Sequence, residues 1–153
     1  MRIILSLLMT LFILACSTKT TLVNAPVSAL FIEAERNYAA GHYKQAEKRY
    51  LKVLEYRKNH LESSFKLANI AMRRSDYKRA HYYYAKVIHI SPGHVKSHHN
   101  ITLAHLMAAS KHITDYIKYS RNTKPDVLQL RDAINNYINP AANFRIKASN
   151  TNR

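Results

Sequence analysis

The sequence predicts an all-α protein built from a repeated helix pair. Helix breakers are scarce, because the 153 residues include only 2 glycines and 4 prolines, and both residue types interrupt regular helices. Alanine, leucine, lysine, tyrosine and arginine are abundant between Pro26 and Tyr137. A self-similarity with a period of about 34 residues completes the prediction, since such periods are typical of repeat architectures.

The repeat becomes visible when residues 40–60 (AGHYKQAEKRYLKVLEYRKNH) are aligned with residues 74–94 (RSDYKRAHYYYAKVIHISPGH). Positions one period apart carry the same residue, as in the pairs Tyr43 and Tyr77, Ala46 and Ala80, Tyr50 and Tyr84, Val53 and Val87, His60 and His94. A small residue lets two helices approach at their crossing, and an aromatic residue four positions later fills the space where they diverge. Neither helix can bury its apolar stripe alone, so stacked neighbours must complete the core.

This pattern resembles that of the tetratricopeptide (TPR) family. In residues 61–94, Leu67 and Ala68 match the large and small residues of the first helix (helix A), Ala80 and Tyr84 match the small and aromatic residues of the second (helix B), and Pro92 separates units. The resemblance covers roughly residues 27–122. It implies a right-handed TPR-like superhelix of about three helix pairs plus a C-terminal capping helix. Its concave groove, lined by the A helices, would bind proteins or peptides.

The expected solenoid spans residues 27–138. Its first repeat, residues 27–60, carries Glu33 where a large apolar residue is expected, and its second spans 61–94. A degenerate third repeat, 95–124, keeps a helix to about Ala109 but places Tyr116 at the small position. Residues 126–138 are expected to form the cap, and residues 139–153 a flexible tail.

Repeat position also predicts which side chains face the groove. The predicted groove residues are Phe31, Glu35, Phe65, Lys66, Asn69, Met72, Arg73, Lys96, His99 and Leu103. Core packing is the better interpretation for the Met and Leu positions, because solenoids bury most of their helical stripes. The carboxylate clamp of chaperone-binding relatives is incomplete, since Lys96 fits it but the matching positions hold Phe31, Glu35, Lys66 and Asn100. Chaperone tails are therefore not the expected partner.

The N-terminus predicts export and a lipid anchor. Met1-Arg2 precedes an apolar run, Ile3 to Leu14, which suits a secretory signal peptide over residues 1–15 and is too short to span a bilayer. Ile13-Leu14-Ala15-Cys16 resembles the bacterial lipobox, which implies cleavage before Cys16 and acylation of that cysteine. Residues 16–26 would then be the lipidated cysteine and a polar tether, with Pro26 in the first turn of the next helix.

Two further points concern the anchor. An intramolecular disulfide is excluded, because Cys16 is the only cysteine; an ordinary signal peptide with an incidental cysteine remains the alternative. Ser17, where inner-membrane lipoproteins commonly carry Asp, resembles the outer-membrane type. The expected location is therefore the outer membrane, facing the periplasm.

The charge balance predicts attraction to anions. The chain carries 24 Lys and Arg against 9 Asp and Glu, and a field of this sign draws polyanions and acidic proteins. A basic ridge is expected on the B helices, formed by Lys44, Lys48, Lys52, Lys78 and Lys86. An exported, anchored chain rarely meets nucleic acid, so anionic lipid headgroups, cell-wall polymer or an acidic protein are the expected polyanions. A solvated face that only keeps the protein soluble is the alternative.

No metal, cofactor or catalytic centre is predicted. His94, His98 and His105 have spacings compatible with one helix face, but no acidic residue lies between Asp76 and Asp115, and zinc sites usually need a closed set with Cys or carboxylate ligands. Neither a Ser-His-Asp motif nor a glycine-rich phosphate loop is present. The sequence therefore favours a binding protein over an enzyme.

Two functions remain. One is a membrane-anchored scaffold or adaptor that binds a protein subunit of an envelope complex; in build it resembles small lipoproteins that assist pilus and secretin assembly. The other is a basic binder of envelope polyanions, such as anionic lipid headgroups or cell-wall polymer.

Overall fold

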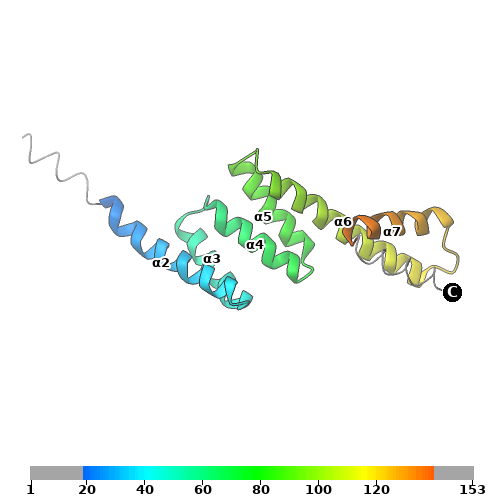
Figure 1. Cartoon of the computed structure of the whole chain (residues 1–153), viewed down its shortest axis with the longest axis horizontal. Helices are drawn as coiled ribbons and strands as arrows, with labels where there is room; N and C mark the ends of the chain where they lie inside the picture. The colour runs from blue at the N-terminus through cyan, green and yellow to red at the C-terminus, as the bar shows by residue number, and fades with distance from the viewer. Residues whose placement is uncertain (1–18, 140–153) are drawn as a thin grey trace, which may run out of the picture. The chain divides into compact units, whose positions relative to one another are not determined.

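The computed structural model describes residues 19–139, and within that range all regular elements are α-helices. The described helices are α2 (Lys19–Ala39), α3 (Tyr43–Tyr56), α4 (Leu61–Arg73), α5 (Tyr77–Ile90), α6 (Val95–Tyr119) and α7 (Pro125–Ile138) (Figure 1). The all-α, TPR-like class predicted from the sequence is confirmed, with the helices packed as consecutive pairs. The chain divides into two compact units, one ending at Ser63 and the other beginning at Ser64.

The helix boundaries follow the period of the sequence repeat. α3 and α5 both begin at a tyrosine, Tyr43 and Tyr77, and α4 and α6 begin at Leu61 and Val95. The turn before each B helix contains a residue in the left-handed region, Gly41 with φ 76° in one case and Ser75 with φ 58° in the other. Glycine adopts this conformation without steric cost, whereas serine does not.

The core of the first unit lies between α2 and α3, which pack side by side (Figure 1). Ala34 on α2 and Ala46 on α3 are both 0% exposed, because small side chains at a helix crossing let the backbones approach. Tyr50 and Val53, on the same face of α3, are equally buried. The small residue and the aromatic residue four positions later are therefore both buried where α3 packs against α2.

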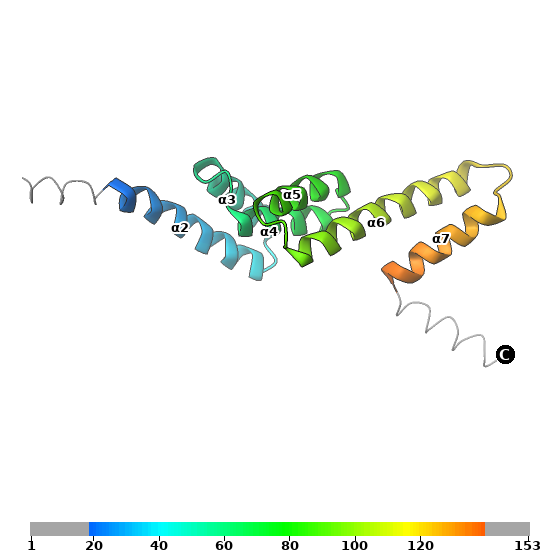
Figure 2. The same ribbon diagram turned by 90° about the horizontal axis from the view of Figure 1, so that it is seen from above.

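The second unit repeats this packing and extends it. α4 lies against α5 through Phe65 and Tyr84, whose ring centroids are 5.8 Å apart; α5 packs on α6, and α6 on α7. α7 runs antiparallel to the C-terminal half of α6 (Figure 2). The buried core residues include Leu67, Ile70, Ala71, Ala80, Tyr84, Val87, Ala104 and Ile134.

The third repeat differs from the prediction. We expected a helix ending near Ala109 within a unit of residues 95–124, but α6 continues unbroken to Tyr119. Ala109 stands one period after Ser75 and two periods after Gly41, and alanine favours the helix where those residues turn the chain. The segment assigned as a cap, now α7, is therefore the second member of the third pair.

The start of the solenoid also differs. We expected residues 16–26 to be a tether and Pro26 to begin a helix, but α2 begins at Lys19 and Pro26 lies inside it. No glycine interrupts residues 19–25, so the helix extends through Pro26 although its missing N–H removes one backbone hydrogen bond. The predicted signal peptide, Cys16 and residues 140–153 lie outside the described residues.

Candidate functional site

In the first unit, a cluster of aromatic and polar side chains joins helix A to helix B. The Phe31 ring lies 4.8 Å from the His60 ring and 6.2 Å from the Tyr50 ring, centroid to centroid. The Tyr50 hydroxyl donates a hydrogen bond of 2.5 Å to a Glu35 carboxylate oxygen. Burial, together with this hydrogen bond and the Glu35 charge, raises the pKa of Tyr50 above its ordinary value. The hydroxyl therefore stays protonated, and keeps donating, well above neutral pH.

The second unit contains the same cluster one period later. The Phe65 ring lies 5.2 Å from the His94 ring, and the Tyr84 hydroxyl donates to the Asn69 Oδ1 atom at 2.6 Å. One contact is added, because Asn100 Nδ2 donates to the same hydroxyl at 3.2 Å. Tyr84 on α5 thus connects Asn69 on α4 with Asn100 on α6. We call these three side chains the Tyr84 junction.

The histidine of each cluster also caps a helix. His60 Nδ1 accepts a hydrogen bond from the Ser63 amide, and His94 Nδ1 accepts one from the Ser97 amide, each at 3.2 Å. A side chain that accepts from an amide of the first turn satisfies one of the donors that a helix start leaves unpaired. Burial lowers the pKa of His60, and nearby Glu62 offsets this only in part.

Four predicted groove residues are therefore partly structural. Phe31 and Phe65 pack within their own repeats, while Glu35 and Asn69 accept from the tyrosine hydroxyls. All four are half-buried. The sequence pattern did not reveal these contacts inside each helix pair.

The remaining predicted groove residues differ in exposure. On α4, Lys66 and Met72 are half-buried and Arg73 is exposed. On α6, Lys96 and His99 are exposed and Leu103 is half-buried. The last three are three and four residues apart, so they share one face of α6. We call Met72, Arg73, Lys96, His99 and Leu103 the α4–α6 face.

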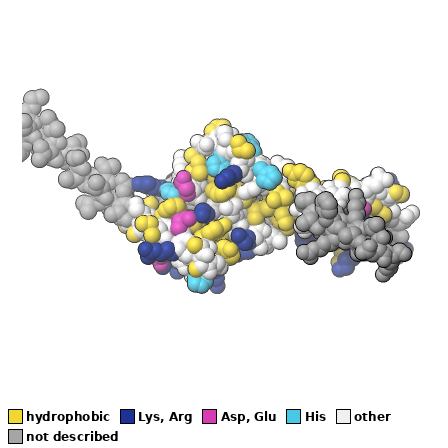
Figure 3. Space-filling view, viewed as in Figure 1, with side chains coloured by type: hydrophobic (Ala, Val, Ile, Leu, Met, Phe, Trp, Pro, Cys, Tyr) yellow, Lys and Arg dark blue, Asp and Glu magenta, His cyan; other side chains and the backbone are white. Residues whose placement is uncertain are grey.

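The predicted basic ridge is continuous on α3 only. Lys44, Lys48 and Lys52 recur every four residues there and all are exposed. On α5, exposed Lys78 and half-buried Lys86 flank the position of Tyr82, which is 60% exposed. In Figure 3, Lys and Arg side chains on the face drawn lie among hydrophobic, acidic and uncharged ones.

Glu33, which departs from the TPR pattern, has a partner on helix B. Its carboxylate forms an ion pair with the Arg49 guanidinium on α3. This hydrogen bond lowers the pKa of Glu33 below its ordinary value and raises that of Arg49. The ion pair takes the place of an apolar contact between α2 and α3 at this position.

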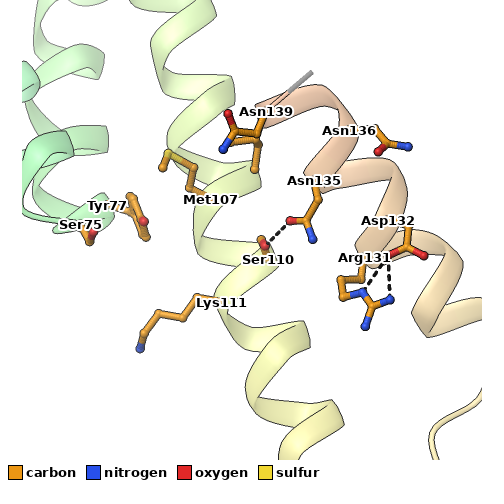
Figure 4. Close-up of a pocket in the computed structure, with 11 residues that line it drawn as sticks. Ser75, Tyr77, Met107, Ser110, Lys111, Arg131, Asp132, Asn135, Asn136 and Asn139 are labelled. Carbon is orange, nitrogen blue, oxygen red and sulfur yellow. Dashed lines mark hydrogen bonds and ion pairs between the residues drawn. The ribbon is translucent and has the colours of Figure 1, made fainter. Parts of the chain in front are cut away.

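An open cavity of about 980 Å³ lies in the second unit between the start of α5, the middle of α6 and the end of α7 (Figure 4). Most of its lining residues are polar. Ser110 on α6 donates to Asn135 on α7 at 3.0 Å, and Arg131 pairs with Asp132 along α7. Because two pairs of its polar side chains are already bonded to each other and none of its lining residues is buried, the cavity is a weaker candidate than the α4–α6 face.

The histidines weighed in the sequence do not converge. His94 caps α6, and His98 Nε2 lies 2.8 Å from the Pro92 carbonyl oxygen. Within residues 19–139, no three His, Cys, Asp or Glu side chains are placed to hold a metal ion. One pair was missed: His81 Nδ1 on α5 lies 2.9 Å from His105 Nε2 on α6. Their separation of 24 residues matches no metal-site spacing in the sequence.

No protein-family model matches this chain, and no curated protein matches it either. In the part of the chain that the structure describes, no helix has the length and apolar character needed to cross a bilayer.

Proposed function

We propose that this chain is a membrane-anchored TPR-like adaptor that binds a protein or peptide on its α4–α6 face. The observation that carries the proposal is the Tyr84 junction. Asn69 and Asn100 bond to one hydroxyl, so the A helices of two successive repeats are held next to each other at this point. A surface assembled from two A helices is what a partner segment needs to make contacts along its length.

The chemistry of the α4–α6 face supports a protein partner. It combines apolar Met72 and Leu103, both half-buried, with exposed cationic Arg73 and Lys96 and exposed His99. Within the described residues, no hydrogen bond or ion pair engages Lys96 or His99. A mixed surface of this kind can bury an apolar side chain of a partner while the rim cations select acidic neighbours.

The location follows from the lipobox-like sequence. Acylation of Cys16 with more than one chain would give stable anchoring, since one chain alone binds a membrane only marginally. We propose the outer membrane, facing the periplasm, and as partner a subunit of an envelope complex such as a pilus or secretion machine. Cys16→Ser should move the protein out of the membrane fraction and remove the acyl mass. An unchanged membrane fraction and mass would contradict the anchor.

Site-specific crosslinking in intact cells tests the adaptor function. A photo-crosslinking amino acid at His99, on the α4–α6 face, should capture one envelope protein, and the same amino acid at Gln45, exposed on α3, should not. Circular dichroism of both variants would check that they fold. Equal capture from both positions, or capture of lipid and cell-wall material alone, would contradict the proposal.

One observation favours the second function, binding of envelope polyanions. Lys44, Lys48 and Lys52 form an exposed stripe on α3, which would suit phosphate-bearing lipid headgroups or anionic cell-wall polymer. Binding to vesicles that contain anionic lipid should then fall steeply as salt rises, because exposed charges are screened. Binding that persists at high salt would exclude this function.

A further inference from the structure

The histidine pair between α5 and α6 brings two metal-binding atoms together. His81 Nδ1 and His105 Nε2 are 2.9 Å apart, and the two rings meet edge to face with centroids 4.8 Å apart. We propose that His81 and His105 form a two-imidazole site for a divalent ion of the zinc type. A bound ion would link α5 to α6. This inference is independent of the adaptor function.

The geometry is close to what zinc requires. Zinc binds imidazole nitrogen at about 2.0–2.1 Å, so a tetrahedral ion would separate the two nitrogens to about 3.3 Å. A widening of a few tenths of an ångström is within the reach of exposed side chains, and both rings are exposed. In the hydrogen-bonded pair one of these nitrogens carries a proton; on metal binding that proton leaves it and the other nitrogen of the same ring takes one up, so the rings stay neutral.

The surroundings leave room for the rest of the coordination shell. The pair lies at an open cavity of about 280 Å³ whose other lining residues are Tyr77, Lys78, Ala104 and Ala108. Two alanines offer no competing ligand, and water can fill the remaining positions. Lys78 is the one cation among these lining residues; it is exposed, so its flexible stem can carry the ammonium group away into water.

The choice of ion follows from the ligand type. Imidazole nitrogen suits Zn²⁺, Cu²⁺ and Ni²⁺, whereas Mg²⁺ and Ca²⁺ prefer oxygen. No carboxylate is among the lining residues of the cavity, so a hard cation has nothing to bind there. Because His81 belongs to the second repeat and His105 to the third, a bound ion would stiffen the junction between them.

Calorimetric titration of the purified full chain with Zn²⁺ tests the site. We expect one ion to bind per chain, and His81→Asn or His105→Asn to weaken binding about tenfold or more, because a single imidazole cannot replace a pair. His89→Asn on α5 and His112→Asn on α6 are matched controls, since both residues are exposed on the same helices and lie outside the pair. Mg²⁺ should give no binding.

Hydrogen exchange supplies the second measurement. Zn²⁺ should slow amide exchange in α5 and in the first half of α6, and this protection should vanish in either pair variant. The proposal would be overturned by Zn²⁺ binding that survives both substitutions, or by binding without protection of α5 and α6. Failure to bind Zn²⁺ at all would also overturn it, and would leave the adaptor function unaffected.

Discussion

The first and second repeats share their aromatic packing but differ in the group that accepts from the buried tyrosine. In the first repeat Tyr50 donates to the carboxylate of Glu35; in the second Tyr84 donates to the carboxamide of Asn69 and also accepts from Asn100. Through these hydrogen bonds the second tyrosine also bonds to the next A helix, α6. The apolar and aromatic packing forms the helix pair in both repeats, while the polar partner of the tyrosine determines which further helix the pair can bond.

The largest effect should come from removing either tyrosine. Tyr50→Ala and Tyr84→Ala each delete a side chain that is no more than 1% exposed, so we expect a loss of about 3–5 kcal/mol of local stability in each case. Hydrogen exchange, read separately for α3 and α5, measures this.

Exposed tyrosines provide the control for that experiment. Tyr56→Ala in the first repeat and Tyr82→Ala in the second remove side chains that are 55% and 60% exposed, and should change stability by less than about 0.5 kcal/mol. If the buried and exposed variants behaved alike, the shared packing would not be what stabilises the repeats.

Removing only the tyrosine hydroxyl should change amide exchange differently in the two repeats. Tyr84→Phe leaves Asn69 and Asn100 without their common partner, at a cost of about 1–2 kcal/mol, and should speed amide exchange in α4, α5 and the first half of α6. Tyr50→Phe should act on α2 and α3. An unchanged exchange rate in α6 after Tyr84→Phe would show that the Tyr84 junction does not couple the A helices.

Substitutions in the two turns before the B helices should change the stability of the protein in opposite directions. Gly41 has φ 76°, and no atom lies within 4 Å of the point where an alanine Cβ would stand, so Gly41→Ala adds backbone strain alone and should cost about 1 kcal/mol. Ser75 has φ 58°, so Ser75→Gly should relieve strain and gain up to about 1 kcal/mol. Chemical denaturation of both variants gives the two signs, and effects of the same sign would contradict the turn's assigned role.

The smallest effect should be a dependence of the stability of the first repeat on pH. The pKa of His60 is lowered by burial, so the folded state favours the neutral ring; its stabilising contribution is present above the ordinary pKa of about 6.5 and is lost as the pH falls below it. His60→Asn keeps a capping side chain and removes the titrating ring. Its denaturation midpoint should therefore vary less between about pH 7.5 and pH 5.5 than that of the unchanged protein.

The sequence predicted the repeat well because its signals are local. The regular spacing of Ala46 and Ala80, Tyr50 and Tyr84 placed the helix pairs, and all four residues are buried. The length of α6 was missed because the repeat period predicted a turn at Ala109. The helix propensity of the residues there outweighs the period, and α6 continues to Tyr119. The Tyr84 junction and the His81–His105 pair join residues on different helices, and no local pattern records such contacts.

The most direct test of the adaptor function compares two charge reversals on different surfaces. Lys96→Glu alters the α4–α6 face and Lys52→Glu alters the stripe on α3; both lysines are exposed, and the two variants carry the same net charge. Capture of the envelope protein crosslinked from residue 99 should fall several-fold with Lys96→Glu and stay unchanged with Lys52→Glu. The opposite result, or an equal loss in both, would contradict binding at the α4–α6 face and favour a general attraction to polyanions.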